Sequence, residues 1–172
     1  PDEVAAAFAT LKKSGKVREF GVSNFRPAQV TLLQKACPAR LVANQVEISL
    51  ANLACFEDGT LDQCLAKHIT PLAWSPLAAG KLGNGAHRLL PSQERYQVGR
   101  TLKELDAQAK SHGATRTQIA LAWLLKHPSG IVPIVGSVHV DRIREAAEAT
   151  KIDLTREDWY RLLETARGER LP

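Results

Sequence analysis

The sequence has 172 residues, of which 44% are hydrophobic and 24% charged, and its formal net charge is +5. This length is enough for one sizeable core and too short for two comfortable domains, and the composition is that of an ordinary globular protein. No apolar run reaches the ~18 residues of a membrane span, and the basic residues are not interleaved with aromatic ones, so we expect neither a membrane nor a nucleic-acid partner.

The first half of the chain alternates between helical and strand patterns. Gly15 closes a first helix, and Pro27 suits the first turn of a second one. Pro71 and Pro76 bound a third strand. In chain order we expect a helix over 2–14, a strand over 17–22, a helix over 27–36, a strand over 41–46, a helix over 61–67 and a strand over 72–74.

The second half begins with residues 77–98, which show no sustained period and predict a long loop of the kind that is usually functional. Thr155 is expected to cap the last helix, with Asp158 in a box-like position. The remaining expectations are helices over 101–111, 117–127, 141–150 and 155–166 and a strand over 131–135.

Alternating strands and helices are typical of parallel βαβ units with right-handed crossovers. The apolar segment 131–135 predicts a sheet that is covered on both faces. About four parallel strands with covering helices make half of an eight-stranded barrel, which leaves two open edges. The chain opens on Pro1 and has no methionine. We therefore expect part of a longer protein, whose open edges the missing N-terminal half or a second copy covers.

Ligands bind at the carboxyl ends of parallel strands, and here those ends turn polar. Ser23, Asn24 and Gln45 end the first two strands and suit either a carboxamide ligand or turn chemistry. Trp74 suits either stacking on a flat ring or a place in the core, and Gly80 belongs to a loop able to cradle a diphosphate.

The end of the fourth strand has the features of an anion site. Gly136 permits close approach, Ser137 offers a hydroxyl, and Arg142 lies in the first turn of the helix that follows. A plain cap by Ser137 and a solvated Arg142 explain the same residues. Glu47 is either a site carboxylate or a structural hydrogen-bonding group near the rim.

Other site types have little support. GKLGNG is not the dinucleotide pattern G-x-G-x-x-G, and Ser75 lacks the G-x-S-x-G elbow of hydrolases. Cys64 and His68 share a helix face, but no further ligands stand nearby in useful spacing, so we expect no metal. The three cysteines form no C-x-x-C pair, which favours reduced thiols and a cytoplasmic protein.

Five segments together resemble the C-terminal half of the aldo-keto reductase superfamily. They are GKVREFGVSNF, NQVEISL, WSPLAAGKL, QIALAWLL, and IVPIVGS followed by DRIREA, and they occur in family order along essentially the whole chain. The resemblance implies that residues 1–172 are the C-terminal half of a (β/α)8 TIM barrel and carry most of an NADP(H) site. Members of this family reduce aldehydes or ketones, which makes a small-molecule carbonyl the expected substrate.

The resemblance also implies roles for single residues. The ends of the first two strands would hold the nicotinamide carboxamide, Trp74 would stack on its ring, and residues 75–82 would wrap the diphosphate. The end of the fourth strand would hold the adenosine 2′-phosphate, with His139 as an additional candidate. The implied cofactor-binding residues are Ser23, Asn24, Gln45, Trp74, Ser75, Leu77, Gly80, Lys81, Gly136, Ser137, Arg142 and Glu145.

Two departures from the family pattern concern the cofactor. A lysine that some members carry at the place of Gly136 is absent, and Ala146 stands where an asparagine often follows Glu145. The expected preference for NADP(H) over NAD(H) therefore rests mostly on Arg142.

The family's catalytic Tyr, Lys, Asp and His belong to strands and loops before the start of this chain. Tyr96 lies in the long loop and Tyr160 in the last helix, so neither has the right context. We assign no catalytic residue and expect the chain alone to be inactive. The alternatives are a non-catalytic nucleotide-binding or regulatory half-barrel module and an unrelated phosphate-binding (β/α)8 barrel.

Overall fold

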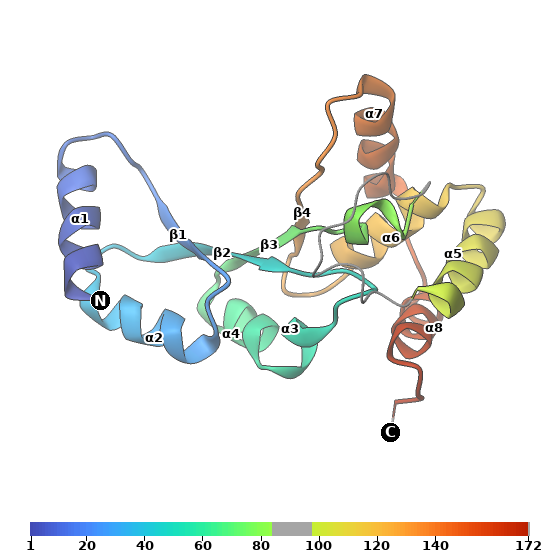
Figure 1. Ribbon diagram of the computed structural model, residues 1–172, viewed down its shortest axis with the longest axis horizontal. Helices are drawn as coiled ribbons and strands as arrows, with labels where there is room; N and C mark the ends of the chain where they lie inside the picture. Colours follow the sequence, from blue (N-terminus) through green and yellow to red (C-terminus); the bar gives the residue numbers. More distant parts are fainter. Residues whose placement is uncertain (84–97, 172) are drawn as a thin grey trace.

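The computed structural model describes residues 1–83 and 98–171, and its centre is a parallel four-stranded sheet (Figure 1). The strands stand side by side in chain order, β1-β2-β3-β4. Helices lie in every crossover between consecutive strands, as expected for parallel βαβ units. The strands are β1 (Phe20–Ser23), β2 (Leu41–Glu47), β3 (Thr70–Trp74) and β4 (Val132–Pro133).

The helices follow the sequence-based expectation closely, because their end signals are local. Pro27 is the first residue of its helix, and Thr155 caps the last one in a reciprocal box with Asp158. A single-turn helix over Ala54–Glu57 was not predicted. The α-helices are α1 (Asp2–Lys13), α2 (Pro27–Ala36), α3 (Ala54–Glu57), α4 (Thr60–Lys67), α5 (Gly99–His112), α6 (Arg116–Leu125), α7 (Val140–Glu148) and α8 (Arg156–Arg167), and the 3₁₀ turns are η1 (Ala78–Gly80) and η3 (Ala149–Lys151).

All four strand predictions differ from the observed bounds, that of β2 only by its last residue, Glu47. β1 begins at Phe20 and not at residue 17, and Pro71 lies inside β3 instead of bounding it. Pro71 comes just before the first β3–β4 pair at Leu72, a place where a missing N–H is tolerated. β4 has two residues instead of five, although the Ile134 N–H donates to the Ala73 carbonyl at 2.9 Å and extends the ladder by one bond.

The prediction that both sheet faces are covered was also wrong for the described residues. Val46 and Ala73 pair across the sheet and are buried, whereas their neighbours Gln45 and Leu72 are partly exposed. Val132, in register with Leu72, is 47% exposed. The reason is that α2, α3 and α4 lie along one face only (Figure 1). The opposite face therefore keeps apolar surface that the described residues leave open.

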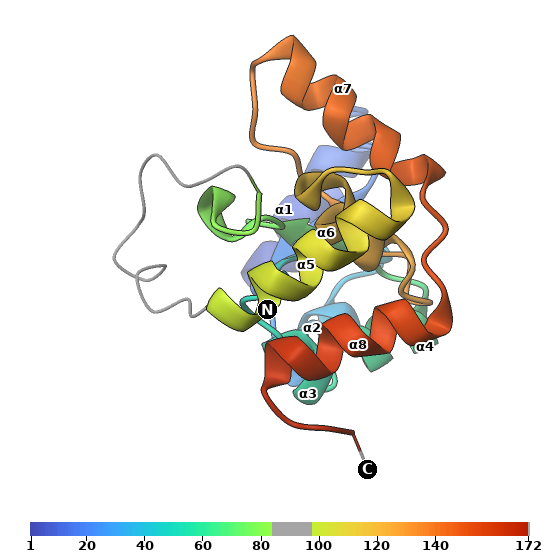
Figure 2. The ribbon, with the colours of Figure 1, turned by 90° about the vertical axis from the view of Figure 1, so that its right-hand side faces the viewer.

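The larger core includes Val46 and Ala73 of the sheet and extends into the layer where α5 packs against both α6 and α8 (Figure 2). The predicted deep packing of the α6 helix is confirmed, because Trp123 is fully buried there. Trp123 and Trp159 stack at 5.3 Å, and each indole N–H donates to the other residue's carbonyl. This reciprocal pair locks α8 onto α6.

The predicted loop over 77–98 is only partly described. It begins with the short η1 turn, and residues 84–97, including Gly85, Pro91 and Tyr96, lie outside the described residues. No helix among the described residues is both long and apolar enough to pass through a membrane.

Candidate functional site

The ends of the first three strands meet, as their polar residues predict. The Asn24 N–H and the Ser23 hydroxyl both donate to the Gln45 carbonyl, at 2.8 and 3.1 Å. The Trp74 indole N–H donates to the Asn24 carboxamide oxygen at 3.0 Å. Four of the candidate residues thus form one hydrogen-bonded group at the carboxyl edge of the sheet.

The burial of Trp74 tests one of its two interpretations, a place in the core. The residue is only partly buried, and it belongs to none of the core clusters among the described residues. The core interpretation of Trp74 was therefore wrong. Its ring stands at the strand edge, with the indole orientation fixed by Asn24.

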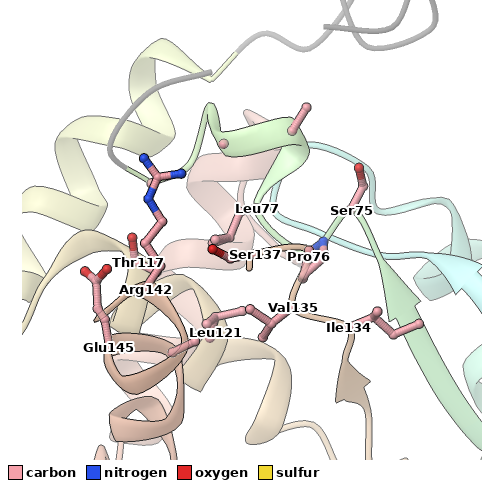
Figure 3. Close-up of a pocket in the computed structure, with 15 residues that line it drawn as sticks. Ser75, Pro76, Leu77, Thr117, Leu121, Ile134, Val135, Ser137, Arg142 and Glu145 are labelled. Carbon is pink, nitrogen blue, oxygen red and sulfur yellow. The ribbon is translucent and has the colours of Figure 1, made fainter. Parts of the chain in front are cut away.

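A cavity of about 510 Å³ opens between the turn after β3 and the start of α7 (Figure 3). Ser75, Pro76 and Leu77 form one side of it, while Arg142 and Glu145 extend from α7 on the other. The cavity brings together seven of the candidate residues, which are Ser75, Leu77, Gly80, Gly136, Ser137, Arg142 and Glu145. Lys81 does not line it.

The α7 side of the cavity contains the start of a helix and the Arg142 side chain. The helix is capped at His139, whose own side chain makes no capping hydrogen bond. The Ser137 hydroxyl accepts from the His139 N–H at 3.2 Å, in the turn before the helix. Ser137 is therefore not a conventional cap, and the capping interpretation of its sequence position was wrong.

The Glu145 carboxylate has a partner that the sequence did not reveal. The Thr115 hydroxyl donates to Glu145 Oε1 at 2.6 Å, and the same hydroxyl accepts from the Gln118 N–H in the cap of α6. Thr115 and Glu145 are 30 positions apart. No local sequence signal marks such a pair, and only the packing of α7 on α6 brings the two together.

Eight further residues line the cavity. Of these, Pro76 and Ala79 lie within 75–82, the segment expected to wrap the diphosphate, and the others were not among the candidates. Thr117 and Leu121 lie on the inward side of α6, and Ile134 and Val135 follow β4. Ile134 and Val135 belong to the strand predicted over 131–135, whereas no sequence signal placed Thr117 and Leu121 at the site. The complete additional lining is Pro76, Ala79, Gly83, Thr117, Leu121, Ile134, Val135 and Ala146.

Glu47 was expected to be either a site carboxylate or a structural hydrogen-bonding group. One of its two oxygens has the structural role. Its Oε2 accepts from Asn52 Nδ2 at 2.8 Å, while Oε1 is buried without a hydrogen-bond partner. The residue is in register with Trp74, so this oxygen lies at the same strand edge as the polar group.

The cysteines are unsuited to nucleophilic chemistry. All three are buried and free, as the reduced-thiol prediction expects. Burial raises the pKa of Cys55 to about 12 and that of Cys64 to about 11, which keeps both thiols protonated near neutral pH.

Within the described ranges, no set of three His, Cys, Asp or Glu side chains gathers as metal ligands. Tyr160 lies on α8, against Trp159 and Arg156.

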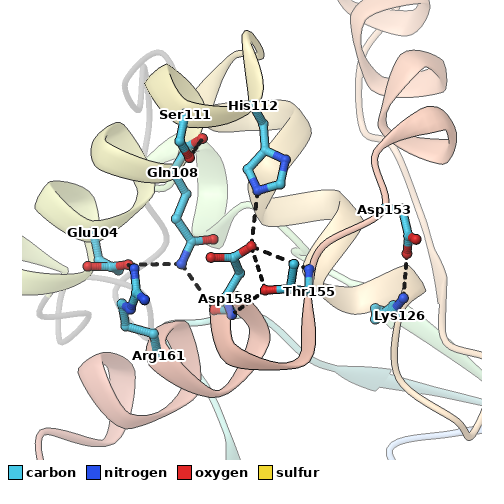
Figure 4. Close-up of polar contacts among 9 residues, drawn as sticks. All are labelled: Glu104, Gln108, Ser111, His112, Lys126, Asp153, Thr155, Asp158 and Arg161. Carbon is cyan, nitrogen blue, oxygen red and sulfur yellow. Dashed lines mark hydrogen bonds and ion pairs between the residues drawn. The ribbon is translucent and has the colours of Figure 1, made fainter.

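A cluster of polar and charged side chains lies between α5 and α8 (Figure 4). His112 Nε2 lies 3.1 Å from Asp158 Oδ2, and Gln108 Nε2 donates to Glu104 and to the Asp158 carbonyl. Burial raises the pKa of Asp158, but hydrogen bonds from Thr155 and His112 outweigh burial and hold that pKa below its ordinary value. These contacts join two packed helices and not the strand ends, so we assign the cluster to packing.

Residues 1–167 match the model of the aldo/keto reductase family. The chain belongs to the aldo/keto reductase family. Among curated relatives, the 6-dehydroglucose reductase of Novosphingobium aromaticivorans is 45% identical over the whole chain, which spans 54% of that protein. The family assignment confirms the resemblance that the five sequence segments carry.

Solved aldo/keto reductases have the same fold. The thermostable reductase Tm1743, in complex with the inhibitor epalrestat, superposes with a TM-score of 0.82 at 30% identity over 95% of this chain and 54% of its own. A reductase from Klebsiella pneumoniae, in complex with NADP and acetate, gives 0.75 at 26% identity over 94% of this chain and 52% of its own. The four parallel strands and their helices thus correspond to about half of an aldo/keto reductase barrel.

Proposed function

We propose that the protein reduces the carbonyl group of a small molecule with NADPH, and that residues 1–172 form the C-terminal half-barrel that holds most of the cofactor. The observation that carries the proposal is the cavity between the β3 turn and the start of α7, with Arg142 at one side. A reductase 45% identical to the chain and a related structure with bound NADP support the assignment.

The strand edge fits the nicotinamide end of such a cofactor. Among the described residues, the side-chain amide of Gln45 and the Nδ2 group of Asn24 make no hydrogen bond, so both are available to a carboxamide. Trp74 adds an aromatic face beside them. These donor and acceptor types match a carboxamide on a flat ring.

The α7 side fits the phosphate end. The N–H groups of the first helical turn and the Arg142 guanidinium favour a bound phosphate. Glu145 is held by Thr115, which leaves its Oε2 as an acceptor toward the cavity. We assign the 2′-phosphate to Ser137 and Arg142 and the adenine to Glu145, and we assign the diphosphate to the turn that includes Ser75, Leu77, Gly80 and Lys81.

When bound, NADPH supplies the hydride that reduces the carbonyl carbon. The contribution of this chain is to bind and orient the cofactor: Asn24 and Gln45 fix the carboxamide, and Trp74 fixes the plane of the ring. A proton donor for the carbonyl oxygen is not assigned to any described residue. In the proposed division of labour, that group comes from the part of the family barrel that this half does not represent.

The expected substrate is an aldehyde or ketone, and the name of the 45% identical relative makes 6-dehydroglucose the first compound to test. We propose a cytoplasmic location and no nucleic-acid or membrane partner, in line with the reduced thiols and the scattered basic residues.

The test uses the protein expressed from its full gene. Oxidation of NADPH should depend on 6-dehydroglucose or another aldehyde, and NADH should support lower rates at equal concentration. Tight NADP⁺ binding without turnover of any carbonyl in a broad panel would favour the regulatory module. Absence of dinucleotide binding would refute the proposal.

A further inference from the structure

The turn after β3 has an unfavourable backbone. Ser75, Ala78 and Ala79 all have positive φ, at 51°, 48° and 55°, although none of them is glycine. Such a conformation is unfavourable for a residue other than glycine and persists only where the surroundings enforce it. Because Ser75 and Ala79 line the cavity, whatever enforces this turn also determines the shape of the cavity.

The two ends of the turn are held in different ways. Its start continues from β3. Further along the turn, Ala78 and Leu82 are fully buried in the larger core. Its last described residue, Gly83, is held by a side chain from another element: Arg116 Nη1 donates to the Gly83 carbonyl at 3.1 Å. Arg116 is the first residue of α6.

Asp106 on α5 orients the Arg116 guanidinium. Arg116 Nε donates to Asp106 Oδ1 at 2.7 Å, and Nη2 donates to Oδ2 at 2.8 Å. This bidentate pair fixes the plane of the guanidinium and aims Nη1 at Gly83. The Arg116 side chain is 28% exposed, less than most surface cations here. The three residues form a clamp from α5 through α6 to the turn.

At Gly83 the turn packs closely against α6 beside the cavity. A Cβ atom on Gly83 would lie 3.0 Å from the Thr117 hydroxyl oxygen, so the turn passes close to α6. Both residues line the cavity, whereas Arg116 and Asp106 do not. The clamp therefore acts on the cavity through the turn and not by touching its contents.

We infer that Arg116, oriented by Asp106, is a positioning residue: it holds the strained turn over residues 75–83 in the shape that receives the dinucleotide. The inference rests on the proposed NADP(H) site and deepens it. A surface ion pair that only adds stability, and a cation that attracts the phosphates directly, are the two competing roles for Arg116.

The experiment compares three variants of the protein expressed from its full gene. Arg116→Ala and Asp106→Asn each break the clamp. Arg161→Ala is the matched control, since Arg161 on α8 pairs with Glu104 on α5 at 3.8 Å (Figure 4), and neither residue lines the cavity. NADP⁺ dissociation constants are measured by calorimetry, melting temperatures by circular dichroism, and local exchange by mass spectrometry.

If the clamp positions the turn, Arg116→Ala and Asp106→Asn each raise the NADP⁺ dissociation constant by about three- to tenfold, as loss of one or two hydrogen bonds predicts. Arg161→Ala changes it by less than about twofold, as expected for an exposed pair. Exchange at the Leu82 and Gly83 amides, which bond to the Leu77 and Gly80 carbonyls, also speeds up in the two clamp variants.

Asp106→Asn separates the competing roles, because it removes a negative charge. A direct electrostatic role of Arg116 predicts tighter NADP⁺ binding in this variant, and such a result would overturn the inference. Unchanged affinity and exchange with a lowered melting temperature would leave only a stabilising ion pair and would overturn it too. If the unmutated protein binds no dinucleotide, the proposed function fails, whereas unchanged binding in the variants refutes the clamp alone.

Discussion

Replacing Arg142 with alanine tests the proposed cofactor preference most directly. The guanidinium lines the cavity beside Ser137 and the first turn of α7, where the 2′-phosphate is assigned. NAD⁺ lacks this phosphate, so the substitution should weaken NADP⁺ binding and leave NAD⁺ binding almost unchanged.

The expected loss of NADP⁺ affinity depends on how exposed the Arg142 side chain is. A hydrogen bond to a charged group contributes about 1.5–3 kcal/mol, and solvent screening favours the lower part of this range for a side chain as exposed as Arg142. A loss of about 1.5–2 kcal/mol corresponds to a roughly 10- to 30-fold higher dissociation constant for NADP⁺.

The assay is a titration of Trp fluorescence with NADP⁺ and with NAD⁺, using Arg144→Ala as the control. Arg144 lies on the same helix and pairs with Asp141 at 3.5 Å, but it does not line the cavity. The control variant should bind both dinucleotides almost as the unmutated protein does. If Arg142→Ala lowers the affinity for NADP⁺ and NAD⁺ equally, or lowers neither, the Arg142 guanidinium does not bind the 2′-phosphate.

Three further outcomes are expected. Thr155→Ala removes the cap of α8 and should lower the free energy of unfolding by ~1 kcal/mol in urea melts, with Thr165→Ala near the end of the same helix as the control. Burial lowers the pKa of His127, so the folded state disfavours its proton, and stability should fall as the pH drops below about 7 toward 5. Urea melts of His127→Gln across that range should show a smaller fall, and an equal fall would exclude His127 as its source. The 172-residue chain alone should give no carbonyl-dependent NADPH oxidation, and a robust rate would place a proton donor within it.

Sequence reasoning succeeded where the signals are local. Pro27 and Thr155 mark helix starts through their own chemistry, and both elements begin where predicted. The strand-end rule brought Asn24, Gln45 and Trp74 to one edge, because parallel strands in chain order must end on the same side. The match to the family model over residues 1–167 confirms the family resemblance.

Predictions from the sequence were wrong where contacts between residues far apart in the chain determine the structure. The apolar segment after Ile131 was expected to be a fully covered strand, yet coverage depends on which helices pack there and not on the segment itself. The pairs Thr115–Glu145 and Arg116–Gly83 depend on how α6 meets its neighbours. Capping and periodicity carry no information about such contacts.

The order of the strands has a consequence for how the chain reaches its structure. Each strand pairs with the one that precedes it along the chain, so every new strand leaving the ribosome finds its neighbour already synthesised. The paired segments are nevertheless far apart in sequence, as the pair of Leu72 and Val132 shows, so sheet formation should be slower than in a protein dominated by local contacts.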